Sequence, residues 1–151
     1  MTYRSGEEAL LSIVRGASPW NPDNTSANNW DILNTGKSNY LILRPGEEFE
    51  AQVISIDGVT TRTTWSTVVE VWRLHKDFKN IANLEDDVDL TIREIEKYPY
   101  LGKGASGDIQ RATVSTGGPI ESRWSASGGP TWLVQEFTVS WVEERRVAHS
   151  E

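Results

Sequence analysis

The alternation of β-forming and polar residues is strongest in the middle of the chain. Residues 49–56 and 59–74 form two such runs, and Asp57-Gly58 separates them. Asp-Gly between two β-forming runs is typical of a two-residue type I′ turn, because that turn needs a positive φ at both central positions. The pattern therefore predicts a hairpin over residues 49–74. Its second run is more than twice as long as an ordinary strand, so we expect it to bend or to project as an arm.

The predicted turn also fixes which residues face each other across the hairpin. A two-residue connection places Ile56 opposite Val59 and, in the same register, Glu50 opposite Trp65. Ile54, Ile56 and Val59 then gather at the tip. On a projecting arm these apolar side chains have no core of their own, which favours a contact with another protein surface. If the hairpin lies flat on its own domain, the same residues belong to the core.

Two segments carry apolar residues at helical spacing. Residues 7–14 follow a capping box that begins at Ser5, and residues 84–98 follow Asn83, which we expect to cap a second helix. Pro99 ends this second helix. Its predicted core stripe consists of Val88, Ile92, Ile95 and Tyr98.

The remaining strands are bounded by turn-forming residues. They are predicted at residues 40–43, 109–115, 120–124 and 132–143. Gly-Gly-Pro occurs at 117–119 and again at 128–130, and we interpret the two copies as turns of a meander. In the last strand, Trp132 and Trp141 fall on opposite faces. We expect Trp141 in the core and Trp132 at an interface.

This order of elements predicts an α+β fold, with a mostly antiparallel sheet, about two helices packed on one face and a long protruding β-hairpin. A length of 151 residues favours a single domain, 1–151. Two segments extend it: the hairpin 49–74 and the loop 17–39, which is rich in Asn, Ser and Thr and contains Trp20 and Trp30.

Composition narrows the functional classes. The net charge of −7 argues against a protein that grips nucleic acid, because such proteins concentrate Lys and Arg against phosphates. The chain has no cysteine, which excludes disulfides, thiolate nucleophiles and zinc–thiolate sites. No apolar run approaches the roughly 20 residues that span a bilayer, so we expect no membrane association.

Candidate catalytic residues are few. His75 stands beside Lys76 at the end of the long strand and His149 lies in a charged tail, so neither has a sequence neighbour that would orient it as a general base. The carboxylates between 85 and 89 suit the first turn of a helix better than a magnesium site. Residues 102–107 look like a phosphate loop, but a strand follows where a helix is required. We therefore expect no catalytic residue, no cofactor and no metal.

The order of elements resembles that of the tail terminator proteins of long-tailed bacteriophages and, more loosely, other head–tail neck proteins. The resemblance is carried by the helix 7–14, by Val68-Val69-Glu70-Val71-Trp72 with the helix 84–98 that follows, and by residues 132–139. It implies a structural virion protein of the tail or neck that is assembled in the host cytoplasm and has no catalytic activity.

The same resemblance implies the partners. A tail terminator forms a ring, here expected to be a hexamer, that caps the tail tube protein, ends tail growth and offers its other side to the head–tail connector or stopper protein. DNA would pass through the ring without specific binding, which agrees with an acidic subunit. The candidate interface residues for a neighbouring subunit or the tail tube are Ile54, Ile56, Val59, Trp65 and Trp132.

Two other functions stay open on the sequence. The long loop and the long hairpin also suit a head–tail adaptor or a tail tube subunit. From a different class, a carbohydrate-binding module would use Trp20, Trp30 or Trp124, because indole rings stack on sugars.

If the hairpin tip contacts a neighbouring subunit, Ile56→Asp is expected to give a folded monomer that fails to assemble, because a charge replaces an apolar contact. Native mass spectrometry and circular dichroism measure the two properties together. If this variant still forms rings, the hairpin tip is not part of the interface.

Overall fold

A computed structural model describes residues 3–46, 50–53, 60–76, 79–102, 109–124 and 130–146, with the backbone alone at 50–53, 110, 124, 145 and 146. The helices are α1 (Tyr3–Arg15), the short 3-10 helix η1 (Trp30–Asn34) and α2 (Lys79–Glu96). The strands are β1 (Thr25–Ala27), β2 (Asn39–Pro45), β3 (Glu50–Val53), β4 (Thr60–Leu74), β5 (Ile109–Val114), β6 (Glu121–Trp124) and β7 (Thr131–Arg146). The predicted α+β class is confirmed.

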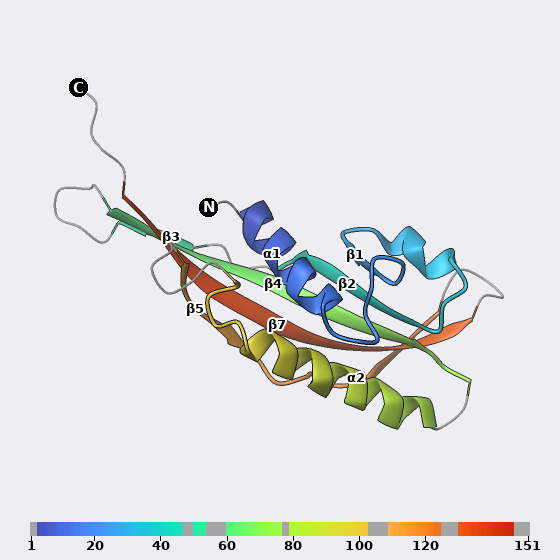
Figure 1. Cartoon of the computed structure of the whole chain (residues 1–151). Coiled ribbons are helices and arrows are strands. Elements are labelled where there is room, and N and C mark those ends of the chain that lie inside the picture. Colours follow the sequence, from blue (N-terminus) through green and yellow to red (C-terminus); the bar gives the residue numbers. More distant parts are fainter. Residues whose placement is uncertain are drawn as a thin grey trace.

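The centre of the sheet is the antiparallel pair of β4 and β7, which have 15 and 16 residues. They pair without a register shift from Thr60 opposite Arg146 to Leu74 opposite Trp132. Strands of globular proteins are usually about 5 or 6 residues long, so this pair is unusually extended. Figure 1 shows that the ends of β4 and β7 near β3 reach beyond both helices.

Each central strand is flanked by two shorter strands in line with each other. β2 and then β3 pair antiparallel with β4, and β5 and then β6 pair antiparallel with β7. The chain therefore keeps its direction between β2 and β3, and again between β5 and β6. The described part of the sheet therefore has two antiparallel units, β4 with β2 and β3 and β7 with β5 and β6. Each unit has an interrupted outer strand, and α2 lies between the two units in sequence. β1 adds a parallel edge beside β2.

The predicted meander is therefore wrong at its first turn. Residues 117–119 do not reverse the chain, because β5 and β6 both pair with β7 and not with each other. The Gly118 N–H donates to the Glu136 carbonyl oxygen at 2.8 Å, which holds the interrupted segment along β7. Gly-Gly-Pro here breaks the regular ladder of an edge strand, where the missing N–H of proline is tolerated.

The predicted hairpin register is also wrong by one residue. Thr61 lies opposite Val53, where the Asp57-Gly58 turn would place Ile54, and Glu50 lies opposite Thr64 instead of Trp65. A two-residue turn needs an even number of residues between paired positions, whereas the residues between Val53 and Thr61 are odd in number. The predicted tip, Ile54, Ile56 and Val59, lies outside the described residues, so the protruding hairpin stays a prediction.

The helices cover one face of the sheet. The odd-numbered positions of β4 and β7 point to this face and form its core together with apolar residues of α1, α2 and β2. Its members include Trp20, Leu41, Val71, Leu84, Phe137 and Trp141. Trp141 is 0% exposed, which confirms its predicted place in the core.

Both helices begin before the residues predicted to cap them. α1 starts at Tyr3 instead of after Ser5, because the Tyr3 ring stacks on Trp141 with centroids 6.0 Å apart and its hydroxyl donates to Glu7 Oε2 at 2.8 Å. Burial raises the pKa of Tyr3, so the hydroxyl stays protonated and remains a donor. α2 starts at Lys79, which places Asn83 inside the helix.

The predicted core stripe of α2 is only partly present. Val88 and Ile95 are buried, and Ile92 packs half-buried against the same core. Tyr98 lies beyond the end of α2 and is 42% exposed, so its predicted place in the core is wrong. Leu84 and Thr91 complete the buried side of the helix.

The long loop 17–39 is tied to both faces by its two tryptophans. Trp20 is 3% exposed, and its Nε1 donates to Thr91 Oγ1 of α2 at 2.8 Å. Trp30 begins η1, and its Nε1 donates to Glu70 Oε1 of β4 at 2.8 Å. The loop is therefore part of the folded domain.

Gly6→Ala is expected to lower the free energy of unfolding. A Cβ at Gly6 would lie 2.4 Å from Cζ2 of the buried Trp141 ring. Relieving such a contact in a packed core costs about 1–3 kcal/mol, against a gain of about 1 kcal/mol in helix propensity. Urea denaturation measures the difference, with the exposed Ser12→Ala as the control on the same helix. A more stable Gly6→Ala protein would contradict the close packing of α1 on Trp141.

Candidate functional site

The face of the sheet opposite the helices is only partly covered. At one end, η1 lies over a second apolar cluster that contains Tyr40, Ile42, Trp72, Trp132 and Val134. Beyond this cluster the even-numbered positions of β4 and β7 are polar or small and half-buried. They include Arg62, Thr64, Val68, Thr138, Ser140 and Val142.

A buried carboxylate lies at the boundary between the covered and the open part of this face. Glu70 of β4 is 2% exposed. Its Oε1 accepts hydrogen bonds from Nε1 of Trp30 at 2.8 Å and from Nε1 of Trp72 at 3.0 Å. Its Oε2 accepts one from Arg44 Nε at 2.8 Å. Three donors from β2, β4 and η1 therefore satisfy the two carboxylate oxygens at one point, as burial of a charge requires.

Two arginines extend this network along the same face, from β2 and β4 to β7 and β6. Arg44 Nη2 lies 3.1 Å from Glu136 Oε2 of β7. Arg123 of β6 donates through Nη2 to Glu136 Oε1 at 2.7 Å and to Glu121 Oε2 at 3.3 Å. Its guanidinium carbon lies 5.2 Å from the centroid of the Trp72 ring, within the range of a cation–π contact.

The two guanidinium groups respond to opposing influences. Burial alone would lower the pKa of Arg44, but its hydrogen bond to Glu70 and the charge of Glu136 outweigh burial and raise that pKa. Burial acts on Arg123 in the same direction, and its hydrogen bond to Glu136 with the charge of Glu70 again raises the pKa. Both arginines therefore stay charged, and the network of three glutamates and two arginines keeps a net charge of −1.

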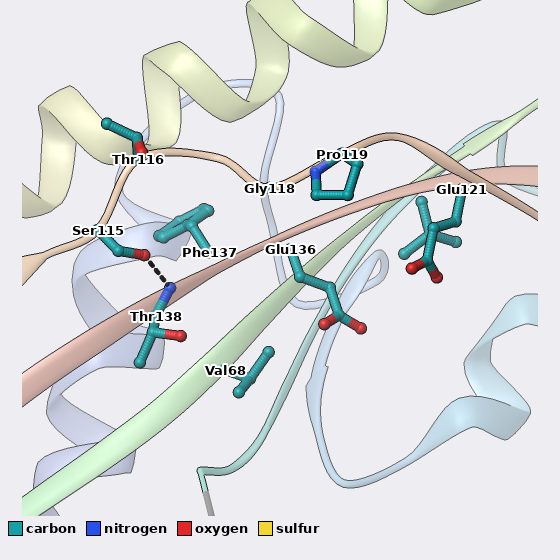
Figure 2. Close-up of a pocket in the computed structure, with 10 residues that line it drawn as sticks. Val68, Ser115, Thr116, Gly118, Pro119, Glu121, Glu136, Phe137 and Thr138 are labelled. Carbon is teal, nitrogen blue, oxygen red and sulfur yellow. Dashed lines mark hydrogen bonds between the residues drawn. The ribbon is translucent and has the colours of Figure 1, made fainter.

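A pocket of about 250 Å³ opens beside this network, where the outer strand is interrupted between β5 and β6. Val68 and Thr138 lie at one end of it, and the carboxylates of Glu136 and Glu121 lie toward the other, with Pro119 above them (Figure 2). Its wall is held by one hydrogen bond to a side chain and one between backbone groups. The Thr138 N–H donates to Ser115 Oγ at 2.8 Å and the Ser115 N–H donates to the Thr138 carbonyl oxygen at 2.9 Å.

Of the predicted interface residues, the two that are described, Trp65 and Trp132, lie on different faces of the sheet. Ile54, Ile56 and Val59 lie outside the described residues. Trp65 is half-buried on the helix face, where its ring lies 5.8 Å from that of Tyr3 and its Nε1 donates to Glu143 Oε2 at 3.3 Å.

The predicted place of Trp132 at an interface is wrong for the single chain. Its indole is 3% exposed. It packs edge-on against Tyr40 and Trp72, with ring centroids 5.6 Å and 6.2 Å away. The alternation along β7 correctly places Trp132 and Trp141 on different faces of the sheet. The loop 17–39, however, folds over the face that carries Trp132 and covers it.

The charged network is the feature that sequence reasoning missed. Glu70 lies within an apolar run and Arg44 precedes a proline, so neither residue stands out in sequence. The sequence did contain a signal. Several strands carry a charged residue among the alternate positions that point to this face. Only the pairing of the strands brings these charges together.

The residues considered for catalysis or metal binding remain dispersed where they are described. His75 is exposed at the end of β4, whereas His149 and residues 103–107 lie outside the described part of the chain. Within the described ranges, no group of three or more histidine or carboxylate side chains is placed to hold a metal ion. No helix among those ranges is long and apolar enough to cross a membrane.

Comparison with models of known protein families and with curated proteins found no match to this chain.

Glu70→Gln is expected to lower the free energy of unfolding by about 1.5–3 kcal/mol, because a neutral amide replaces the charged acceptor of three hydrogen bonds from Trp30, Trp72 and Arg44, while Arg44 keeps its pairing with Glu136. Thermal and urea denaturation measure the loss. Glu8→Gln serves as the control, since Glu8 pairs with Arg4 through side chains that are 65% and 85% exposed, and such pairs contribute about 1 kcal/mol or less. Equal effects of the two substitutions would contradict a central role of Glu70.

Proposed function

We propose that this chain is a structural virion protein of a long-tailed bacteriophage. It forms a ring, expected to be a hexamer, that caps the tail tube, ends tail growth and joins the tail to the head connector. The observation that carries the proposal is the extended central pair of strands, whose ends reach beyond the helical layer (Figure 1) and whose second face is only partly covered. Such surfaces are suited to contacts between subunits.

Two further observations support this role. The α+β arrangement, with helices on one face of a mostly antiparallel sheet, is the fold that the resemblance to tail terminators implies. The net charge of −7 suits a ring through which DNA passes, because an acidic subunit does not retain phosphates.

The interface of such a ring is heterologous, because each subunit presents different patches to its neighbours on the two sides. The open face of β4 and β7 is one candidate patch. Its half-buried Thr, Ser and Val side chains are polar enough to remain soluble in the free subunit and flat enough to pack against a neighbour. The buried Trp132 takes no part in this proposed interface.

The function is tested by native mass spectrometry of the purified protein over a wide concentration range, followed by its addition to polymerising tail tube protein. A discrete hexamer that stops tube growth is the expected result. A monomer at every concentration that leaves tube growth unchanged would contradict the proposal.

A tail tube subunit is the second candidate, because an extended sheet end also suits contacts between stacked rings. The same measurements separate the two functions. A terminator gives single rings, whereas a tube subunit gives stacked polymers without a fixed length.

A further inference from the structure

The pocket between β5 and β6 combines two kinds of lining. Val68, Val134 and Pro119 provide apolar surface, and Glu121 and Glu136 provide carboxylates. Lysine and arginine have the matching architecture, since an apolar stem carries a cationic head. A volume of about 250 Å³ holds several water molecules at about 30 Å³ each, and so accommodates the heavy atoms of one such side chain.

The charges around the pocket favour a cation. Glu70, Glu121 and Glu136 face only Arg44 and Arg123 within the network, which leaves one negative charge in excess. Glu121 is the most accessible carboxylate, with 59% of its side chain exposed and Arg123 as its partner. A further cation at Glu121 would neutralise the network without breaking any of its bonds.

The pocket is preformed. The Gly118 N–H bond to the Glu136 carbonyl and the two bonds between Ser115 and Thr138 fix its wall in the single chain. A ligand therefore meets a shaped site and loses little free energy in ordering it.

The same chain presents lysines at a different place. Lys37 precedes β2 and Lys76 follows β4, and both residues are exposed. The two segments lie side by side, because the Leu74 N–H donates to the Ser38 carbonyl oxygen at 2.8 Å. The chain thus carries an acidic pocket beside β6 and β7 and a basic patch, Lys37 and Lys76, at the end of the β2–β4 pair.

We infer that this pocket receives a lysine of the basic patch from a second copy of the chain. The inference rests on the proposed ring, because an acidic pocket and a separate basic patch form a head-to-tail contact, which is the kind that closes into rings. The lysine stem lies against Val68 and Pro119, and its ammonium group pairs with Glu121 and Glu136.

The experiment is a charge exchange followed by native mass spectrometry of the full chain. Glu121→Lys is expected to raise the protein concentration needed for half-maximal assembly at least about tenfold, because an attractive contact becomes a repulsive one. Asp23→Lys makes the same change of charge at an exposed loop position and is expected to assemble like the original protein. The double variant Lys37→Glu/Lys76→Glu is expected to weaken assembly, and its combination with Glu121→Lys is expected to restore it.

Glu121→Gln provides a milder test, since it removes the charge without placing a cation beside Arg123, and circular dichroism verifies the fold of each variant. Normal rings from Glu121→Lys would overturn the pocket assignment and leave the ring itself intact. Equal weakening by Asp23→Lys, or no restoration in the combined variant, would also overturn it. Absence of any assembly in the original protein would contradict the proposed ring and this contact together.

Discussion

The pairing of the Glu70 carboxylate is the interaction on which the arrangement of the sheet depends. A charge that is 2% exposed is tolerated only when it is paired and hydrogen-bonded. Here the partners come from β2, from the neighbouring Trp72 and from η1, and Arg44 and Arg123 carry the network on to β6 and β7. A one-residue slip of any of these strands would turn its charged side chain to the helix face. The network therefore favours one register for the sheet.

This constraint explains why the two faces differ. The helix face is filled mainly by odd-numbered apolar positions and closed by α1 and α2, and its charges lie in separate contacts, Glu143 with Trp65 and Arg73 with Asp87. The other face is apolar only where η1 covers it, and the charged network marks the limit of that cover. Past this limit the described positions are mostly Thr, Ser and Val, with the Arg62–Glu144 ion pair farther along the strands. The interruption of the outer strand opens the pocket beside Glu136 and Glu121. The polar part of the face is thus available to another molecule without exposing the core.

Local patterns predicted the elements, and long-range pairing decided how they combine. The helices, the strand 40–43 and the final strand follow from periodicity, which depends on near neighbours in sequence. The register of β3 and the straight course of residues 117–119 depend on β4 and β7, far away in the chain. The burial of Trp132 also depends on a contact between segments far apart in the chain. Its face was correctly assigned from alternation, but its burial depends on a loop that lies about 100 residues earlier.

A half-polar face is also the kind of surface that a regulated assembly requires. A flat apolar sheet face or a bare strand edge associates with any similar surface, whereas charged pairs discriminate between correct and incorrect neighbours. Glu121 and Glu136 repel acidic surfaces, including the acidic parts of a second copy of this chain, whose net charge is −7. Only a surface that brings a cation to this place gains from the contact. If the chain forms the proposed ring, a polar pocket favours the correct neighbour without the nonspecific association that an additional apolar patch would cause.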